Sequence, residues 1–183
     1  MKKNLLNINA WHMPDPGQWM FSANELACTT QIFDGELDDP RATAFLISNE
    51  TFGGDILFSV DINFEVGRYI GVYLDFDQKS QSGIWMATGH ALSGDAPDNE
   101  VERGYIKTVD NDCWIIRTTG ELVVKKGEML RLGFANKNDD YSLWNDGKLV
   151  ITYHKPGGYP AGPLQLRLMN AKARIHRLEV QSD

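Results

Sequence analysis

The chain has 183 residues, a formal net charge of −7 at pH 7 and a pI of about 5.1. This acidic balance argues against nucleic acid and anionic membrane partners, because both are bound through basic surfaces. No stretch approaches the roughly 18 apolar residues that a membrane-spanning helix needs, so we expect no membrane insertion. The length suits one domain with a sizeable core, and we expect residues 1–183 to form it.

The first residues resemble a secretion signal only at their start. Lys2 and Lys3 are basic, but Asn7 and Asn9 interrupt the apolar stretch that a signal peptide requires. We therefore expect either a cytoplasmic protein or the mature form of a secreted one. Cys28 and Cys113 lie far apart in expected strands, and we expect buried free thiols rather than a disulfide.

Short alternating segments follow an irregular start over residues 1–18. No segment longer than about ten residues has the 3.6-residue period of a helix. About a dozen short strands separated by turns are typical of a β-sandwich or barrel, and we predict an all-β, two-sheet antiparallel β-sandwich of jelly-roll type. The expected strands cover 19–21, 25–30, 42–48, 55–64, 69–77, 83–88, 101–109, 113–119, 121–124, 130–135, 141–144, 148–154, 164–169 and 173–180.

Alternation assigns faces within these strands. In 55–64, apolar residues at every second position predict a core face, which leaves Asp61 on the other face. In 69–77 the same rule places Tyr73 and Asp75 away from the core. Trp114 shares its parity with Ile116, which predicts a core position. A slip of parity in the last strand predicts a bulge near His176 and Arg177.

The stretch 129–153 predicts a three-stranded meander. Asn145-Asp146-Gly147 is a tight-turn signal, because Gly adopts positive φ without steric cost. Two expected loops, 89–99 with several Gly, Asp and Pro residues and 154–163 with several Gly and Pro residues, are candidates to cover an outward aromatic face.

Three parts of the chain carry a family resemblance. They are Gln18-Trp19 with Glu25-Leu26-Ala27, the strand from Phe52 to Ile62, and the C-terminal series Asn145–Lys148, Gly162–Leu166, Ala171–Ile175 and Leu178–Val180. In these parts, and over nearly its whole length, the chain resembles the concanavalin A-like jelly-roll domains. Within that group it is most similar to LamG-like and CBM66-type sugar-binding modules and to the related domain of 3-keto-disaccharide hydrolases. The resemblance implies the fold and leaves the function open, because this architecture serves lectins, binding modules, hydrolases and lyases.

Catalytic patterns are weak. A glycosidase needs two facing carboxyl groups, and Asp61, Asp75 and Asp77 share the predicted outward face of neighbouring strands, but a solvated sheet face is the favoured interpretation of these residues. No G-x-S-x-G elbow is present, and no two of the four histidines have zinc-ligand spacing. The enzymatic alternative is a glycoside hydrolase or polysaccharide lyase that uses acids together with His90 or His176.

An acidic loop is the candidate metal site. Jelly-roll modules of the resembled kind often hold a structural calcium ion. Carboxylate oxygens suit calcium, but the loop lacks EF-hand spacing, so an ordinary solvated loop is the favoured interpretation and no cofactor is required. The candidate ligands are Asp34, Glu36, Asp38 and Asp39.

Carbohydrate binding fits the outward residues best. The C–H face of a pyranose stacks on aromatic rings, and its hydroxyls bond to carboxylate, amide and guanidinium groups. We therefore predict a non-catalytic, lectin-like domain that binds an oligo- or polysaccharide on one concave sheet face. The predicted ligand-binding residues are Tyr73, Trp85, Trp144, Asp61, Asp75 and Arg131. A third alternative is a protein-interaction domain, with a homodimer that buries the aromatic face.

Overall fold

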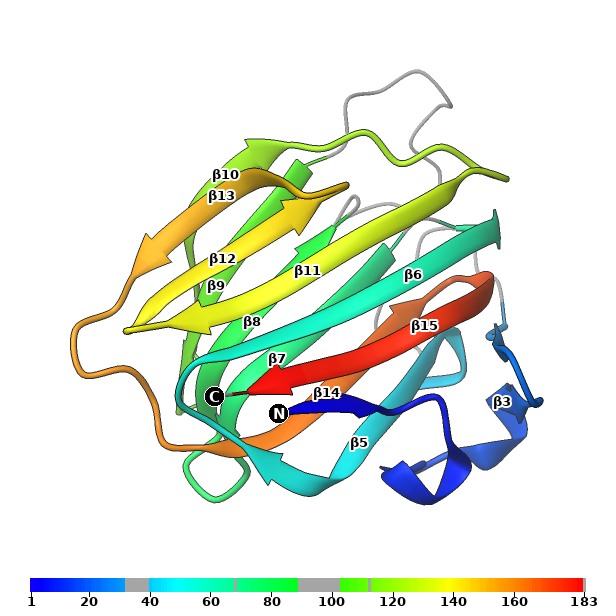
Figure 1. The fold of residues 1–183 in the computed structure, drawn as a ribbon, viewed down its shortest axis with the longest axis horizontal. Helices are drawn as coiled ribbons and strands as arrows, with labels where there is room; N and C mark the ends of the chain where they lie inside the picture. The colour runs from blue at the N-terminus through cyan, green and yellow to red at the C-terminus, as the bar shows by residue number, and fades with distance from the viewer. Residues whose placement is uncertain (32–39, 68, 89–102, 112, 183) are drawn as a thin grey trace.

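Two antiparallel sheets pack face to face in the computed structural model, which describes residues 1–31, 40–67, 69–88, 103–111 and 113–182 (Figure 1). The predicted two-sheet antiparallel sandwich is confirmed. The two chain ends lie side by side, because β1 (Lys2–Asn4) pairs with the end of β15 (Lys172–Ser182).

The front sheet in Figure 1 has the strand order β13-β12-β11-β6-β15-β4-β3, with β1 added to β15. Its strands are β13 (Lys148–His154), β12 (Asp140–Asn145), β11 (Met129–Lys137), β6 (Ile56–Val66), β4 (Leu26–Thr29) and β3 (Trp19–Phe21), besides β15 and β1.

The back sheet has the order β10-β9-β8-β7-β14-β5-β2. Its strands are β10 (Cys113–Glu121), β9 (Arg103–Asp110), β8 (Ser82–Thr88), β7 (Tyr69–Asp77), β14 (Gly162–Met169), β5 (Thr43–Phe52) and β2 (Trp11–His12). Three short 3-10 helices, η1 (Ile8–Ala10), η2 (Pro16–Gln18) and η3 (Pro40–Ala42), lie in the connections.

The core lies between the sheets and follows the alternation of the sequence. Phe58, Val60 and Ile62 on β6 are fully buried, and so are Val72 and Leu74 on β7. Burial of a large apolar side chain contributes about 1.5–3 kcal/mol, so this face holds the two sheets together. Among the described residues, no helix has the length and apolar character to cross a bilayer.

The predicted meander and bulge are both present. β11, β12 and β13 pair in sequence, and the turn between β12 and β13 has Asp146 at φ 48° and Gly147 at φ 73°. Two successive residues with positive φ fit a type I′ hairpin turn, which matches the twist of the strands. The register of β15 against β6 shifts between Ile175 and Arg177, where the bulge was expected.

A second bulge, in β7, has no signal in the alternation. The register of β7 against β8 shifts between Leu74 and Asp77, and Asp75 has a φ of 50°. This residue turns its side chain inward, and Asp75 is 1% exposed. The prediction that Asp75 faces outward is therefore wrong.

Neither cysteine forms a disulfide. Cys28 is buried, as expected, whereas Cys113 on the edge strand β10 is exposed, so the expected burial of the second thiol is wrong.

Candidate functional site

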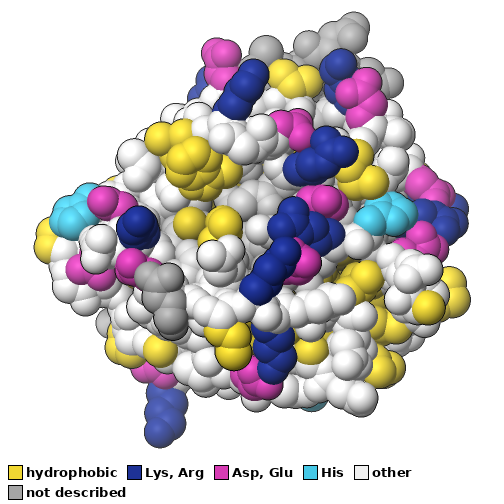
Figure 2. Space-filling view, in the orientation of Figure 1, with side chains coloured by type: hydrophobic (Ala, Val, Ile, Leu, Met, Phe, Trp, Pro, Cys, Tyr) yellow, Lys and Arg dark blue, Asp and Glu magenta, His cyan; other side chains and the backbone are white. Residues whose placement is uncertain are grey.

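A pocket of about 880 Å³ opens on the outer face of the front sheet, over β12, β11, β6 and β15. Figure 2 shows this face, with basic and acidic side chains close together beside a hollow and hydrophobic side chains on its other side. Ligand pockets in proteins usually measure about 300–1,000 Å³, so this one has a suitable size.

The floor of the pocket is low because the sheet places small residues at its centre. Gly133 on β11 pairs with Ser59 on β6 and with Trp144 on β12. The next outward residue on β11 is Ala135, which pairs with Ser142 and Leu57.

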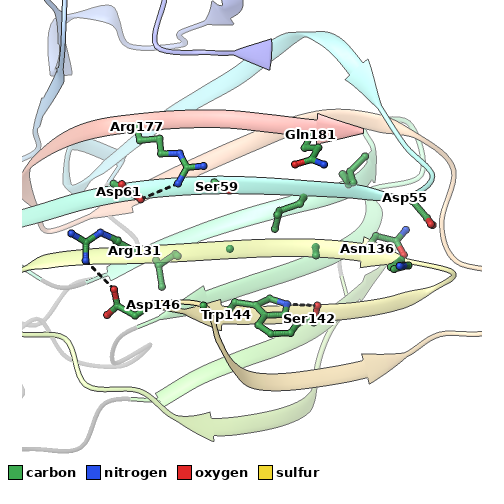
Figure 3. A pocket seen from close by; sticks show the side chains of 17 residues that line it. Asp55, Ser59, Asp61, Arg131, Asn136, Ser142, Trp144, Asp146, Arg177 and Gln181 are labelled. Carbon is green, nitrogen blue, oxygen red and sulfur yellow. Dashed lines mark hydrogen bonds and ion pairs between the residues drawn. The ribbon is translucent and has the colours of Figure 1, made fainter. Parts of the chain in front are cut away.

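The indole of Trp144 stands beside this floor (Figure 3). Its ring N–H donates a hydrogen bond to the hydroxyl of Ser142 at 2.8 Å. This bond fixes the orientation of the ring. A half-buried, oriented indole beside a small-residue floor presents a flat apolar surface to a ligand.

A line of charged side chains borders the other part of the pocket. Arg131 pairs across the strands with Asp61, and Asp61 pairs with Arg177. The Arg131 guanidinium lies 3.1 Å from the Asp146 carboxylate, and the Arg177 guanidinium lies 3.9 Å from Asp61 (Figure 3). Such partly exposed pairs add about 0–1 kcal/mol each, so their main effect is to position donors and acceptors around the pocket.

The structure divides the six predicted ligand-binding residues among three places. Asp61, Arg131 and Trp144 line the pocket on the front sheet. Tyr73 and Trp85 lie together in an aromatic cluster on the back sheet, away from the main core. Asp75 is the buried bulge residue. The prediction that all six share one face is wrong, because alternation separates inward from outward positions but does not assign a strand to a sheet.

Asp75 connects the two sheets. Its Oδ2 accepts hydrogen bonds from the amide of Asn136 at 2.9 Å and from the hydroxyl of Tyr141 at 2.8 Å. Its Oδ1 is buried and has no hydrogen-bond partner among the residues that the structure describes. Burial raises the pKa of the Asp75 carboxyl, and the two hydrogen bonds oppose part of that rise. This side chain is enclosed by protein and does not reach the pocket.

The aromatic cluster on the back sheet is packed tightly. The rings of Tyr73 and Trp85 have centroids 4.4 Å apart, and Trp85 is only 1% exposed. A Cβ added to Gly71 would lie 1.9 Å from the Trp85 ring, so the indole lies directly on this glycine. Trp85 is therefore not an open platform. Trp114, which contacts both rings and is 39% exposed, is the accessible aromatic residue, and its predicted core position is wrong.

Several other predicted residues lie outside the described parts of the chain. These are the candidate calcium ligands Asp34, Glu36, Asp38 and Asp39, together with His90 and the whole loop 89–99. Within the parts of the chain that are described, no group of three or more His, Cys, Asp or Glu side chains is suited to hold a metal ion. In the loop 154–163, the Tyr159 hydroxyl donates to the Asp110 carboxylate at 2.7 Å, which fastens that loop to the end of β9.

The three carboxylates considered for catalysis do not share a face. Asp61 borders the pocket and Asp75 lies inside the protein. Asp77 accepts hydrogen bonds from the Lys79 backbone and the Ser80 hydroxyl. The expected shared face of these carboxylates is absent, because the bulge reverses Asp75 and β6 and β7 belong to different sheets.

Solved structures identify the architecture. The chain superposes on the carbohydrate-binding module CBM66 from Bacillus subtilis with a TM-score of 0.68 and 16% identity, covering 96% of this chain and 98% of the module. A protein of unknown function with a galectin-like fold from Bacillus subtilis superposes with a TM-score of 0.69 and 12% identity, covering 99% of this chain and 94% of that protein. The fold is a concanavalin A-like jelly roll.

A prokaryotic β-1,3-1,4-glucanase (lichenase) derived from a mouse hindgut metagenome shares this jelly roll, with a TM-score of 0.65 and 9% identity over 98% of this chain and 96% of the enzyme. The resemblance inferred from the sequence is thus confirmed at the level of fold. No protein-family model and no curated protein matches the sequence.

Proposed function

We propose that the chain is a non-catalytic carbohydrate-binding domain and that its ligand occupies the pocket on the front sheet. One observation carries the proposal: the oriented indole of Trp144 stands beside the low floor at Gly133, opposite the charged groups of Arg131 and Asp61. A pyranose ring offers a C–H face to the indole and hydroxyls to the charged groups, so the pocket has both surfaces that a sugar needs.

The charge pattern favours a neutral sugar. Each guanidinium at the pocket already has a carboxylate partner, Asp146 for Arg131, and Asp61 with Glu179 for Arg177. A ligand with a net charge would therefore meet a pocket whose own charges are balanced. Hydroxyl groups can donate to the carboxylates and accept from the guanidiniums without disturbing that balance.

The structural neighbours support a glycan ligand. One of them is a carbohydrate-binding module, another is a legume lectin-like domain from Entamoeba histolytica, and a third is a toad ovary galectin in complex with thio-digalactose. Their identity to this chain is between 11% and 16%, so they support the class of ligand and not a particular sugar.

The test is a glycan-array screen with and without Ca²⁺, followed by calorimetry on the strongest neutral glycan. Trp144→Ala should weaken binding about tenfold or more, because loss of an aromatic stacking contact costs on the order of 1.4 kcal/mol. Met20→Ala, which removes an exposed side chain on β3, is the control and should bind normally. An affinity that survives Trp144→Ala but disappears in Trp114→Ala would move the site to the back sheet and refute the proposal.

The same experiment separates the alternative functions. Slow consumption of a bound oligosaccharide would identify an enzyme of the glycoside hydrolase or polysaccharide lyase class. A negative array together with a sharp dimer on sizing would favour a protein-interaction domain. No arrangement of the described carboxylates specifically favours the enzymatic alternative.

A further inference from the structure

A second cluster of polar groups lies on the outer face of the back sheet, which the proposed pocket does not use. We call it the basic aromatic patch, and it consists of Tyr69, Tyr73, Trp85, Tyr105, Lys107, Trp114 and Arg167. The strand register brings its polar members together. Arg167 on β14 pairs with Gly71 on β7, Gly71 pairs with Ala87 on β8, and Ala87 pairs with Tyr105 on β9. Gly71 and Ala87 are the small residues between Arg167 and Tyr105, and the ring of Trp85 covers the surface over Gly71.

Two cations in the patch have no acidic partner in the part of the chain that the structure describes. Among the described residues, no carboxylate lies within ion-pair distance of Lys107 or Arg167. The Nε of Arg167 is buried and has no hydrogen-bond partner among the described residues, while its Nη2 donates to the Thr43 hydroxyl at 3.5 Å. Burial lowers the pKa of Lys107, and the positive charge of Arg167 lowers it further. A partly buried cation that meets a like charge without an anion is unfavourable.

Aromatic rings offset only part of that cost. The Lys107 ammonium lies 4.8 Å from the centroid of Tyr105 and 5.7 Å from that of Trp114, and the Arg167 guanidinium lies 5.3 Å from that of Phe45. Cation–π contacts contribute about 0.5–2 kcal/mol each, but a ring face cannot accept the directed hydrogen bond of the Arg167 Nε–H as an oxygen does.

Two tyrosine hydroxyls complete the patch. The Tyr105 hydroxyl donates to the Tyr69 hydroxyl at 3.2 Å, which leaves the Tyr69 proton for another acceptor. Burial raises the pKa of both phenols, so both stay neutral donors at physiological pH. The positive charge of Arg167 lowers the pKa of both phenols and so opposes part of that rise.

We propose that the basic aromatic patch binds the carboxylate of an acidic sugar between Arg167, Lys107 and the Tyr69 hydroxyl, with the sugar ring against Trp114. The anionic part of this proposal rests on the patch alone: the outer face of the back sheet carries two cations without a carboxylate partner among the described residues, in a protein whose net charge is −7. That a sugar carries the anion rests on the proposed function. Trp114, 39% exposed and edge-on to Trp85, supplies the apolar surface.

The test uses sodium glucuronate as the probe, methyl glucoside as its neutral counterpart and sodium sulfate as a competitor. Binding is followed by tryptophan fluorescence and calorimetry. Arg167→Gln and Lys107→Gln should each weaken glucuronate binding at least tenfold, and added salt should weaken it in the wild type. Lys148→Gln, which removes an exposed charge on the front-sheet strand β13, is the matched control and should bind glucuronate normally.

The outcomes distinguish this proposal from the front-sheet pocket. Glucuronate binding that is unchanged in both glutamine variants overturns the patch, and so does equal binding of methyl glucoside. Sulfate that binds as tightly as glucuronate supports the anion site and overturns the sugar. Trp144→Ala should leave glucuronate binding intact, because Trp144 lies on the front sheet and the patch on the back sheet. If neutral glycans do not bind the protein, the pocket is refuted and the patch is not. If Arg167→Gln does not fold by circular dichroism, Lys107→Gln and sulfate competition decide the matter.

Discussion

The buried carboxyl of Asp75 should make the protein less stable as the pH rises. Its pKa is raised by burial in the folded state, so between about 3.9, the unfolded value, and the folded value the folded protein binds more protons than the unfolded chain. The free energy of unfolding therefore falls with rising pH in that window, by at most about 1.4 kcal/mol per pH unit for this one group. Below the window the carboxyl is neutral in both states and the effect is absent.

The variant D75N removes the carboxyl and so isolates its contribution to the pH dependence of stability. The amide keeps an oxygen for the Asn136 and Tyr141 donors, and its N–H replaces Oδ1, the buried oxygen without a partner. The side-chain oxygen of Asn136 is also buried without a partner among the described residues, and the new N–H can donate to it. Asparagine tolerates positive φ, so the bulge at 50° is preserved. Relief of an unsatisfied buried acceptor is worth about 1–3 kcal/mol, and we expect D75N to be more stable than wild type by that amount at pH 8.

Urea unfolding at several pH values between 4 and 8 measures the effect. The difference in the free energy of unfolding between D75N and wild type should be small at pH 4 and grow with pH. It reports Asp75 alone, because the contributions of the other titrating groups cancel in the difference. Tyr141→Phe, which deletes one donor to the charged form, should destabilise the protein more at pH 8 than at pH 4. A difference that does not change with pH, or a D75N protein that is less stable at every pH, would refute the reasoning.

Two other predictions test packing and burial. Gly71→Ala should lower the free energy of unfolding by about 1–3 kcal/mol in urea titrations, because its Cβ would overlap the ring of Trp85 at 1.9 Å. Gly133→Ala, whose nearest contact would be 3.2 Å, should leave stability nearly unchanged and weaken binding of neutral glycans by filling the pocket floor. A thiol reagent should modify Cys113 alone in the native protein and both cysteines after denaturation, because Cys28 is buried and burial raises the pKa of its thiol; rapid native labelling of Cys28 would contradict the structure.

The strands could be predicted because the signal for them is local. Alternation along 55–64 fixed which residues of β6 enter the core, and the turn at Asp146 and Gly147 set the register of β12 against β13. The bulge in β15 was visible because apolar residues on both sides of it had to keep facing inward. The bulge in β7 was not visible, because Asp75 is polar and its inward position depends on Asn136 and Tyr141, which lie on other strands.

The candidate site was only half predictable for a related reason. The sequence distinguishes outward from inward residues, but the outer faces of two packed sheets point in opposite directions. Trp144 and Trp85 have the same outward parity and lie on different sheets. Their environments also differ: Trp144 stands at an open pocket, whereas Trp85 lies on Gly71 under other rings. Which aromatic residue stays accessible is decided by strand order, which depends on contacts between distant parts of the chain.

The two outer faces differ in how their charges are arranged, and this difference predicts different ligands. On the front sheet, Arg131 and Arg177 both have carboxylate partners, so a ligand there gains little from carrying a charge. On the back sheet, Lys107 and Arg167 have no carboxylate partner among the described residues, so an anionic ligand gains more binding free energy there than a neutral one. Salt should therefore weaken binding at the back sheet much more than binding at the front sheet. Comparing the salt dependence of glucuronate and neutral-glycan binding in one protein tests both assignments, because equal slopes would show that the two ligands share one face.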